Sequence, residues 1–222
     1  MLAVAHRAPA DPARAARLAA AGAGMFELDI QLRGSGVVVS HYLPFGRFGV
    51  QRDNWRLRVG AGRDLSVAEA LRVLPGDVDV LLDPKHHRGF AAEDLVGAVA
   101  AVVADQPDRF VVSTGRPELL RAYRALGLRT WRSIGDRVAL RQVLSGDRLP
   151  DDGVSVRHSL LDAETVRALH GITGIIAAWT VNHERRALHL ADLGVDAITT
   201  DRPTVLQAVA GHVRPGASGE RQ

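Results

Sequence analysis

The sequence predicts an α/β protein folded as a compact eightfold (β/α) TIM barrel, and three observations support this prediction. Short runs of apolar, often β-branched residues alternate with stretches that have the spacing of amphipathic helices. Most of these runs are apolar on both faces, which is typical of strands buried in a parallel sheet. Eight such pairs fit into 222 residues, and barrels of this kind begin at about 200 residues.

Each element can be assigned in chain order. The expected strands are Leu2–His6, Met25–Leu32, Val78–Leu82, Phe110–Ser113, Thr130–Ile134, Gly153–Arg157, Ile175–Thr180 and Asp196–Thr200. The expected helices, which alternate with them, are Pro12–Ala21, Ser66–Leu74, Ala91–Asp105, Pro117–Leu126, Arg137–Leu144, Ala163–His170, His183–Leu193 and Thr204–His212. The regular alternation is what a closed parallel barrel requires.

Capping residues mark the ends of several of these helices. Ser66 and Asp162 stand at N-cap positions, where a side-chain oxygen can accept from the first free backbone N–H groups. Gly127, Gly171 and Gly194 follow helices, at positions where glycine often takes the left-handed conformation. These residues place the helix boundaries independently of the apolar periodicity.

An open, doubly wound sheet has the same alternation and is the alternative fold. That fold favours a glycine-rich turn after the first strand, whereas here the first strand ends in His6-Arg7-Ala8-Pro9. We expect residues 1–213 to form a single domain, with an elaborated loop after the second strand that includes a short β-like run, Val37–Ser40. We expect the Gly/Ser-rich tail, residues 214–222, to be disordered.

Composition excludes several classes of function. The chain has no cysteine, so disulfides, zinc–cysteine sites, iron–sulfur clusters and thiol nucleophiles are excluded. No apolar run approaches the roughly 20 residues of a membrane span, and the N-terminus lacks a signal-peptide pattern. We therefore expect a cytoplasmic protein with no stable membrane insertion. The sequence leaves the oligomeric state open.

The distribution of charge argues against nucleic acid as a partner. The 28 basic and 25 acidic residues leave a net charge of +3, and the two signs are interleaved along the chain. Only one of the 28 basic residues is a lysine, Lys85. A position that retains lysine in so arginine-rich a chain suggests a need for a compact ammonium group.

Polar residues cluster at the ends of the apolar strands, where barrel enzymes hold their active sites. Glu27 and Asp29 lie two residues apart on one strand and therefore point to the same face, and Asp83 ends the next strand. Neighbouring carboxylates repel and are costly to bury, and a divalent cation relieves both problems. These oxygen ligands suit Mg²⁺ or Ca²⁺. Salt bridges to Arg7 or Lys85 are the alternative interpretation.

Two histidines and two cations complete the predicted site. His6 ends the first strand and His41 follows the short run after the second, so both could transfer protons near neutral pH. Arg7 and Lys85 supply the positive charge that an anionic phosphoester would need. Trp179, at the end of the seventh strand, could line the wall of the pocket.

The motifs together resemble those of the glycerophosphodiester phosphodiesterase family, and they span nearly the whole chain in the family's order. They are His6-Arg7, Glu27-Leu28-Asp29, Val38-Val39-Ser40-His41, Asp83-Pro84-Lys85, Trp179-Thr180-Val181-Asn182 and the closing segment from Gly194 to Pro203. Asp83 stands where the family commonly has glutamate. Each motif is weak alone, but jointly they are specific.

The resemblance implies a metal-dependent hydrolase of glycerophosphodiesters that releases glycerol 3-phosphate and an alcohol. It implies that Glu27, Asp29 and Asp83 hold Mg²⁺ or Ca²⁺ and that His6 and His41 are the general acid and base. It further implies that Arg7 and Lys85 hold the phosphate. The substrate's own glycerol hydroxyl would attack the phosphorus through a cyclic phosphate.

Three other functions remain as alternatives. A phospholipase-D-like lyase would stop at the cyclic phosphate, and a non-catalytic barrel would bind phosphoesters without turnover. A sugar-phosphate isomerase would need glycine-rich phosphate loops after the seventh and eighth strands, where the chain has Asn182-His183 and Asp201-Arg202 instead.

Overall fold

Eight parallel strands form the centre of the molecule in the computed structural model, which describes residues 1–7, 11–34, 36–40, 43–45, 50–53, 56–59, 64–85, 91–146 and 151–212. The strands are β1 (Leu2–Ala5), β2 (Met25–Arg33), β8 (Asp79–Pro84), β9 (Phe110–Thr114), β10 (Arg129–Ile134), β11 (Gly153–Arg157), β12 (Ile175–Trp179) and β13 (Ala197–Thr200). Each pairs in parallel with the next around the ring. β1 pairs with both β2 and β13, so the sheet closes on itself.

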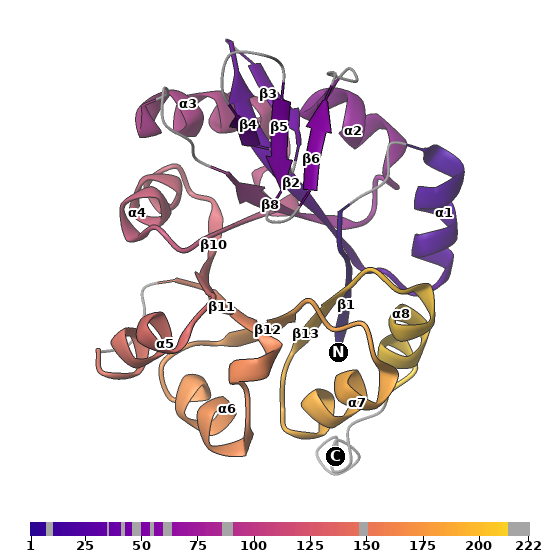
Figure 1. The fold of residues 1–222 in the computed structure, drawn as a ribbon, viewed down its shortest axis with the longest axis vertical. Helices are drawn as coiled ribbons and strands as arrows, with labels where there is room; N and C mark the ends of the chain where they lie inside the picture. Colours follow the sequence, from indigo (N-terminus) through magenta and orange to yellow (C-terminus); the bar gives the residue numbers. More distant parts are fainter. Residues whose placement is uncertain are drawn as a thin grey trace.

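Eight α-helices surround the barrel on the outside, as Figure 1 shows. They are α1 (Pro12–Ala20), α2 (Val67–Val73), α3 (Ala92–Val103), α4 (Pro117–Ala125), α5 (Arg137–Leu144), α6 (Ala163–His170), α7 (Glu184–Asp192) and α8 (Pro203–Ala210). Short 3-10 turns lie at Pro107–Arg109 and His158–Leu160. The predicted TIM barrel is confirmed, and the open-sheet alternative is excluded by the closing pair of β1 with β13.

Most of the predicted caps have the expected geometry. Ser66 and Glu69 form a reciprocal capping box at α2, and Asp162 accepts from Thr165 N at α6. Gly127 and Gly194 are left-handed, with φ of 79° and 104°. The expectation for Gly171 was wrong, because it has φ of −67° and continues the right-handed turn after α6.

The elaboration predicted after the second strand contains five further strands. β3 (Gly36–Val39) runs antiparallel to β2 and pairs with β7 (Leu65–Ser66). The strands β4 (Leu43–Phe45), β5 (Val50–Asp53) and β6 (Arg56–Val59) form a separate antiparallel sheet. His41 and the predicted disordered tail, residues 214–222, lie outside the described residues.

The barrel interior is filled by an apolar layer, and the functional residues lie directly beyond it. The layer consists of Val4, Met25, Leu81, Val111, Trp131, Ala177 and Ala197. Two residues further along each strand, side chains line a cavity: His6, Glu27, Asp83, Ser113, Ser133, Trp179 and Thr199. Since alternate residues of a strand share a face, the apolar layer fixes which later residues point inward.

A larger apolar core lies between the strands and the surrounding helices. Among the residues buried there are Phe26, Leu95, Leu119, Leu169 and Leu206. This second layer holds the helices against the barrel and leaves the interior free to carry polar residues. No helix in the described part of the chain is long and apolar enough to cross a membrane.

Candidate active site

The candidate site is a cavity of about 450 Å³ at the C-terminal ends of the barrel strands. Its ionisable lining comes from three neighbouring strands and the residues that follow them: His6 and Arg7 after β1, Glu27 and Asp29 on β2, and Asp83 and Lys85 at the end of β8. The remaining described lining comes mainly from β9 to β13 and is uncharged. The cavity therefore has a charged half and a neutral half.

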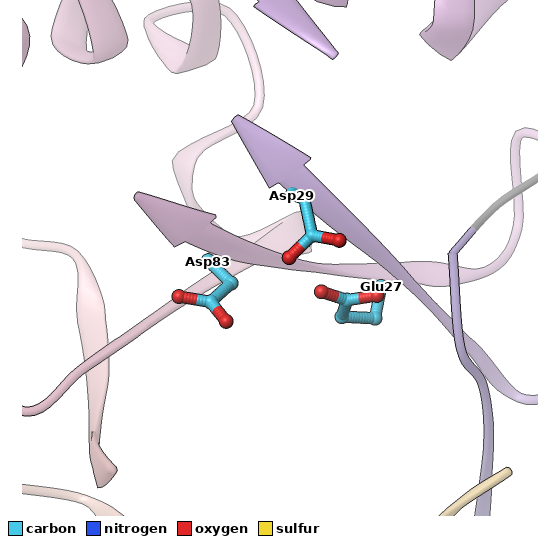
Figure 2. A group of neighbouring side chains, drawn as sticks. All are labelled: Glu27, Asp29 and Asp83. Atoms are coloured by element: carbon cyan, nitrogen blue, oxygen red, sulfur yellow. The ribbon is translucent and has the colours of Figure 1, made fainter. Parts of the chain in front are cut away.

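Three carboxylates converge in the charged half. Asp29 and Asp83 are direct partners in the pairing of β2 with β8, and Glu27 lies two residues before Asp29 on the same face. Each residue offers an oxygen, and these oxygens lie within 4.8 Å of one another. Figure 2 shows the three side chains reaching into one space beside the two strands. Glu27 and Asp29 are only 4% and 3% exposed.

The burial of so much negative charge has clear electrostatic consequences. Burial raises the pKa of Glu27 well above its ordinary value, and the charges of Asp29 and Asp83 raise it further. A hydrogen bond from Arg7 N, at 2.8 Å, and the charge of Lys85 oppose this rise. The backbone hydrogen bond and the charge of Lys85 thus offset only part of the effect of burial and of the neighbouring carboxylates on the pKa of Glu27.

Lys85 lies between two of the carboxylates. Its Nζ is 2.8 Å from Asp29 Oδ1 and also forms an ion pair with Asp83. Burial alone would lower the pKa of Lys85, but the charges of Asp83 and Asp29 outweigh burial and raise it. The ammonium group is therefore charged at every physiological pH.

The donor set fits a hard divalent cation. Three carboxylates with oxygen ligands and no sulfur or imidazole among them are typical of Mg²⁺ and Ca²⁺ sites. A cation of charge two would relieve the repulsion that raises the pKa of Glu27. The observed salt bridges to Lys85 also match the alternative interpretation from the sequence, and the two arrangements share the same carboxylates.

Arg7 adopts an unusual backbone conformation at the rim of the cavity. Its φ of 55° makes it the single non-glycine residue with positive φ in the described part of the chain. This conformation turns Arg7 N toward Glu27 Oε2, while Arg7 Nε lies 3.6 Å from Asp29 Oδ2. Left-handed backbone at non-glycine residues is uncommon, and such strain concentrates at functional sites.

His6 is held by a carboxylate that the sequence analysis left without a role. His6 Nδ1 lies 2.7 Å from Asp201 Oδ1, and His6 Nε2 lies 3.9 Å from Glu27 Oε2. The hydrogen bond with His6 lowers the pKa of Asp201 to about 2, so Asp201 is ionised near neutral pH. Because an ionised carboxylate only accepts, the Nδ1 atom carries the proton and Nε2 faces the acidic cluster.

Asn182 fixes Asp201 in turn. Asn182 Nδ2 donates to Asp201 Oδ2 at 2.9 Å, and Asn182 Oδ1 accepts from Asp201 N and from Thr200 Oγ1. Both residues belong to motifs quoted from the sequence, but their contacts depend on the closure of the barrel. The signal that could have identified Asp201 is its place at the end of the eighth strand, beside the first.

The structure gathers most of the predicted site residues around one cavity. His6, Arg7, Glu27, Asp29, Asp83, Lys85 and Trp179 all line it. His41, the other predicted site residue, lies outside the described residues. Sequence reasoning missed the uncharged lining, which includes Ser113, Ser133, Ser155 and Thr199. Their two-residue spacing from apolar interior residues could have revealed them.

Comparison with known proteins gives the family and the fold. A model of the glycerophosphoryl diester phosphodiesterase family matches residues 67–205. A search of curated protein sequences finds no match to this chain. Solved structures are similar over nearly the full length, although their sequence identities are low and show the fold alone.

Three of these structures illustrate the similarity. A Silicibacter pomeroyi protein assigned as a glycerophosphoryl diester phosphodiesterase is 19% identical, with a TM-score of 0.75 over 95% of this chain and 92% of that one. An Oleispira antarctica phosphodiesterase in complex with its product sn-glycerol-3-phosphate is 19% identical, with a TM-score of 0.68 and coverages of 94% and 96%. A Thermotoga maritima glycerophosphodiester phosphodiesterase is 19% identical, with a TM-score of 0.66 and coverages of 92% and 96%.

Proposed function

The chain belongs to the glycerophosphoryl diester phosphodiesterase family, and on this premise we propose how its residues carry out the hydrolysis. The proposed substrate is a small glycerophosphodiester, and the products are glycerol 3-phosphate and an alcohol. The observation that supports this most strongly is the convergence of three carboxylates, an oriented histidine and two cations in one cavity.

Glu27, Asp29 and Asp83 are proposed to hold a divalent cation, Mg²⁺ or Ca²⁺. When bound, such an ion neutralises negative charge that develops on the phosphoryl oxygens. Arg7 and Lys85 are the positively charged side chains of the described lining. They are proposed to bind the phosphate oxygens and to orient the diester. Trp179 is proposed to line the space beside the substrate.

His6 is proposed to transfer protons at its Nε2 atom, since Nδ1 is occupied by Asp201. In the first step a glycerol hydroxyl loses its proton to one imidazole and attacks phosphorus. The bond from phosphorus to the alcohol oxygen breaks, and that oxygen takes a proton from the other imidazole. Water then opens the cyclic phosphate to give glycerol 3-phosphate. We propose His41 as the second imidazole, on the sequence pattern alone.

Hydrolysis assays test the overall function. Glycerophosphocholine is incubated with the protein, with and without EDTA, and the products are followed by phosphorus NMR. We expect turnover that EDTA abolishes and that Mg²⁺ or Ca²⁺ restores. Absence of turnover with every divalent metal, or accumulation of cyclic phosphate as the final product, would contradict the proposal.

Substitutions test the individual roles. His6→Ala is expected to lower kcat by roughly 10²-fold or more, the general acid–base range, whereas His189→Ala, an exposed histidine on α7, leaves it unchanged. Asp83→Asn is expected to weaken Ca²⁺ binding in isothermal titration, and Asp77→Asn, in the exposed turn before β8, serves as its control. Equal effects of a variant and its control would refute the assigned role.

A further inference from the structure

The neutral half of the cavity carries a set of hydroxyl groups that the proposed chemistry does not use. Ser113 on β9, Ser133 on β10, Ser155 on β11 and Thr199 on β13 all line the cavity. We refer to these four residues as the hydroxyl wall. Ser133 and Ser155 are direct partners in the pairing of β10 with β11, so two of the hydroxyls lie at the same level of the barrel.

Two polar groups on this side have no hydrogen-bond partner within the part of the chain that the structure describes. Thr199 is 3% exposed and lines the cavity, and its Oγ1 atom is buried without a partner. The buried Nε1 atom of Trp179 is also unpartnered. Native proteins pair nearly all buried polar groups, and each exception calls for an explanation. A ligand hydroxyl in the cavity would supply the missing partner.

Trp179 and Thr199 lie next to each other in the barrel. Ala178 pairs with Ile198, so the two residues follow at the same level of adjacent strands. The six-membered ring of Trp179 lies about 3.9 Å from the place that a Cβ atom on Gly135 would take, so the indole extends from β12 toward the end of β10. The indole and the four hydroxyls thus border the same part of the cavity.

The charge of this wall restricts what it can bind. Within the described lining, every ionisable residue lies on or directly after β1, β2 or β8. Binding of an ammonium or quaternary ammonium group depends on carboxylates or on several aromatic faces. The wall offers one indole and otherwise uncharged hydrogen-bonding groups, which suit uncharged alcohols.

We propose that the hydroxyl wall is a subsite for the alcohol arm of the diester and selects an uncharged polyol over a cationic amino alcohol. This inference rests on the proposed hydrolysis, because the charged half of the cavity must hold the phosphate. Glycerophosphoglycerol is then a better substrate than glycerophosphocholine. The hydroxyls of the polyol arm can accept a hydrogen bond from Trp179 Nε1 and can donate to or accept from Thr199 Oγ1. The choline arm has no free hydroxyl and can form neither hydrogen bond.

The test compares three diesters in the wild-type protein and in Thr199→Val, a variant that keeps the side-chain shape and removes the hydroxyl. The wild type is expected to show a kcat/KM roughly tenfold higher for glycerophosphoglycerol than for glycerophosphocholine. Thr199→Val is expected to lower this ratio about two- to tenfold, the range of a neutral hydrogen bond. Its activity on glycerophosphoethanol, which keeps the attacking glycerol but has no hydroxyl on its ethyl arm, should not change.

Thr173→Val is the matched control, because Thr173 Oγ1 is also buried and unpartnered but does not line the described cavity. It should leave the substrate ratio unchanged. The inference is overturned if glycerophosphocholine is preferred, or if Thr199→Val lowers activity on all three diesters equally.

Failure of the proposed function is a separate result. In that case no diester is hydrolysed by the wild type, and equilibrium binding of glycerophosphoglycerol and glycerophosphocholine replaces kinetics as the measure. Tighter binding of glycerophosphoglycerol that is lost in Thr199→Val would still support the subsite. Equal affinities for the two diesters would overturn it.

Discussion

His6 acquires a defined protonation pattern from its neighbour rather than from its own position in the chain. Asp201 is ionised and accepts from Nδ1, so the opposite nitrogen is directed toward the acidic cluster. Asn182 prevents Asp201 from turning away by bonding its second oxygen. Asp201 is therefore a positioning residue, which acts through His6 and does not itself line the cavity.

Replacing Asp201 tests this role. Asp201→Asn is expected to lower kcat by roughly ten- to a hundredfold with little change in KM, because the tautomer and orientation of His6 are no longer held. Steady-state kinetics on glycerophosphocholine measure both constants. Asp192→Asn removes a similar contact between aspartate and His212, outside the cavity, and should change neither constant. A rise in KM at constant kcat would contradict the positioning role.

The same carboxylate makes stability depend on acid pH. The pKa of Asp201 is about 2 in the folded protein and about 3.9 in an unfolded chain. Its ionised form therefore stabilises the fold above about pH 5, and this contribution is lost as pH falls through 2. Urea unfolding of the wild type and Asp201→Asn should differ at pH 6 and converge near pH 2. A difference that stays constant over this range would exclude the linkage.

At the level of strands, β10, β11 and β12 depend on a close approach in the barrel interior. A Cβ atom on Gly153 would lie 2.8 Å from Trp131 Cδ1 and 2.9 Å from the backbone oxygen of Ile175. Both contacts are shorter than packed atoms allow, and the backbone oxygen is constrained by the sheet. The bulky Trp131 can fill the interior because its neighbour on β11 has no side chain.

Gly153→Ala is consequently expected to reduce the free energy of unfolding by about 1–3 kcal/mol, through overpacking. Urea denaturation monitored by circular dichroism measures the change. Gly97→Ala provides the contrast, because Gly97 lies exposed within α3 with open space around its Cα. That variant should gain about 0.5–1 kcal/mol. A stable Gly153→Ala protein would show that the strands can separate at no cost.

Across the whole molecule, the two ends of the barrel have different roles. The cavity lies at the C-terminal ends of the strands, and a buried ion-pair cluster lies near the opposite end. There the Asp151 side chain is fully buried and pairs with Arg124 and Arg132, which joins α4 to β10 and β11. Residues at that end of a barrel contribute to stability rather than chemistry.

Asp151→Asn should separate the two properties. The substitution leaves Arg124 and Arg132 without a carboxylate partner. We expect the free energy of unfolding to fall by about 2–4 kcal/mol, less than for a fully buried pair because both arginines are partly exposed. Both kcat and KM of the folded protein should equal those of the wild type at 15 °C. A change in KM without loss of stability would place Asp151 in the active site.

Local patterns were sufficient to predict the barrel. Eight apolar runs, eight amphipathic stretches and their capping residues each depend on neighbours within about ten positions, and all eight pairs are present. Glu27 and Asp29 were predictable for the same reason, since the two-residue period of a strand places them on one face. The prediction of a left-handed Gly171 was wrong, because a helix can also end in a right-handed turn.

The contacts that orient the site depend on the closed barrel. His6 and Asp201 are 195 positions apart, and they meet because β1 pairs with β13. The hydroxyl wall likewise comes from four strands between residues 110 and 200, and none of its serines has a motif around it. The periodicity of a strand shows on which face of the sheet a side chain lies. Only the pairing that closes the barrel brings side chains from distant strands around one cavity.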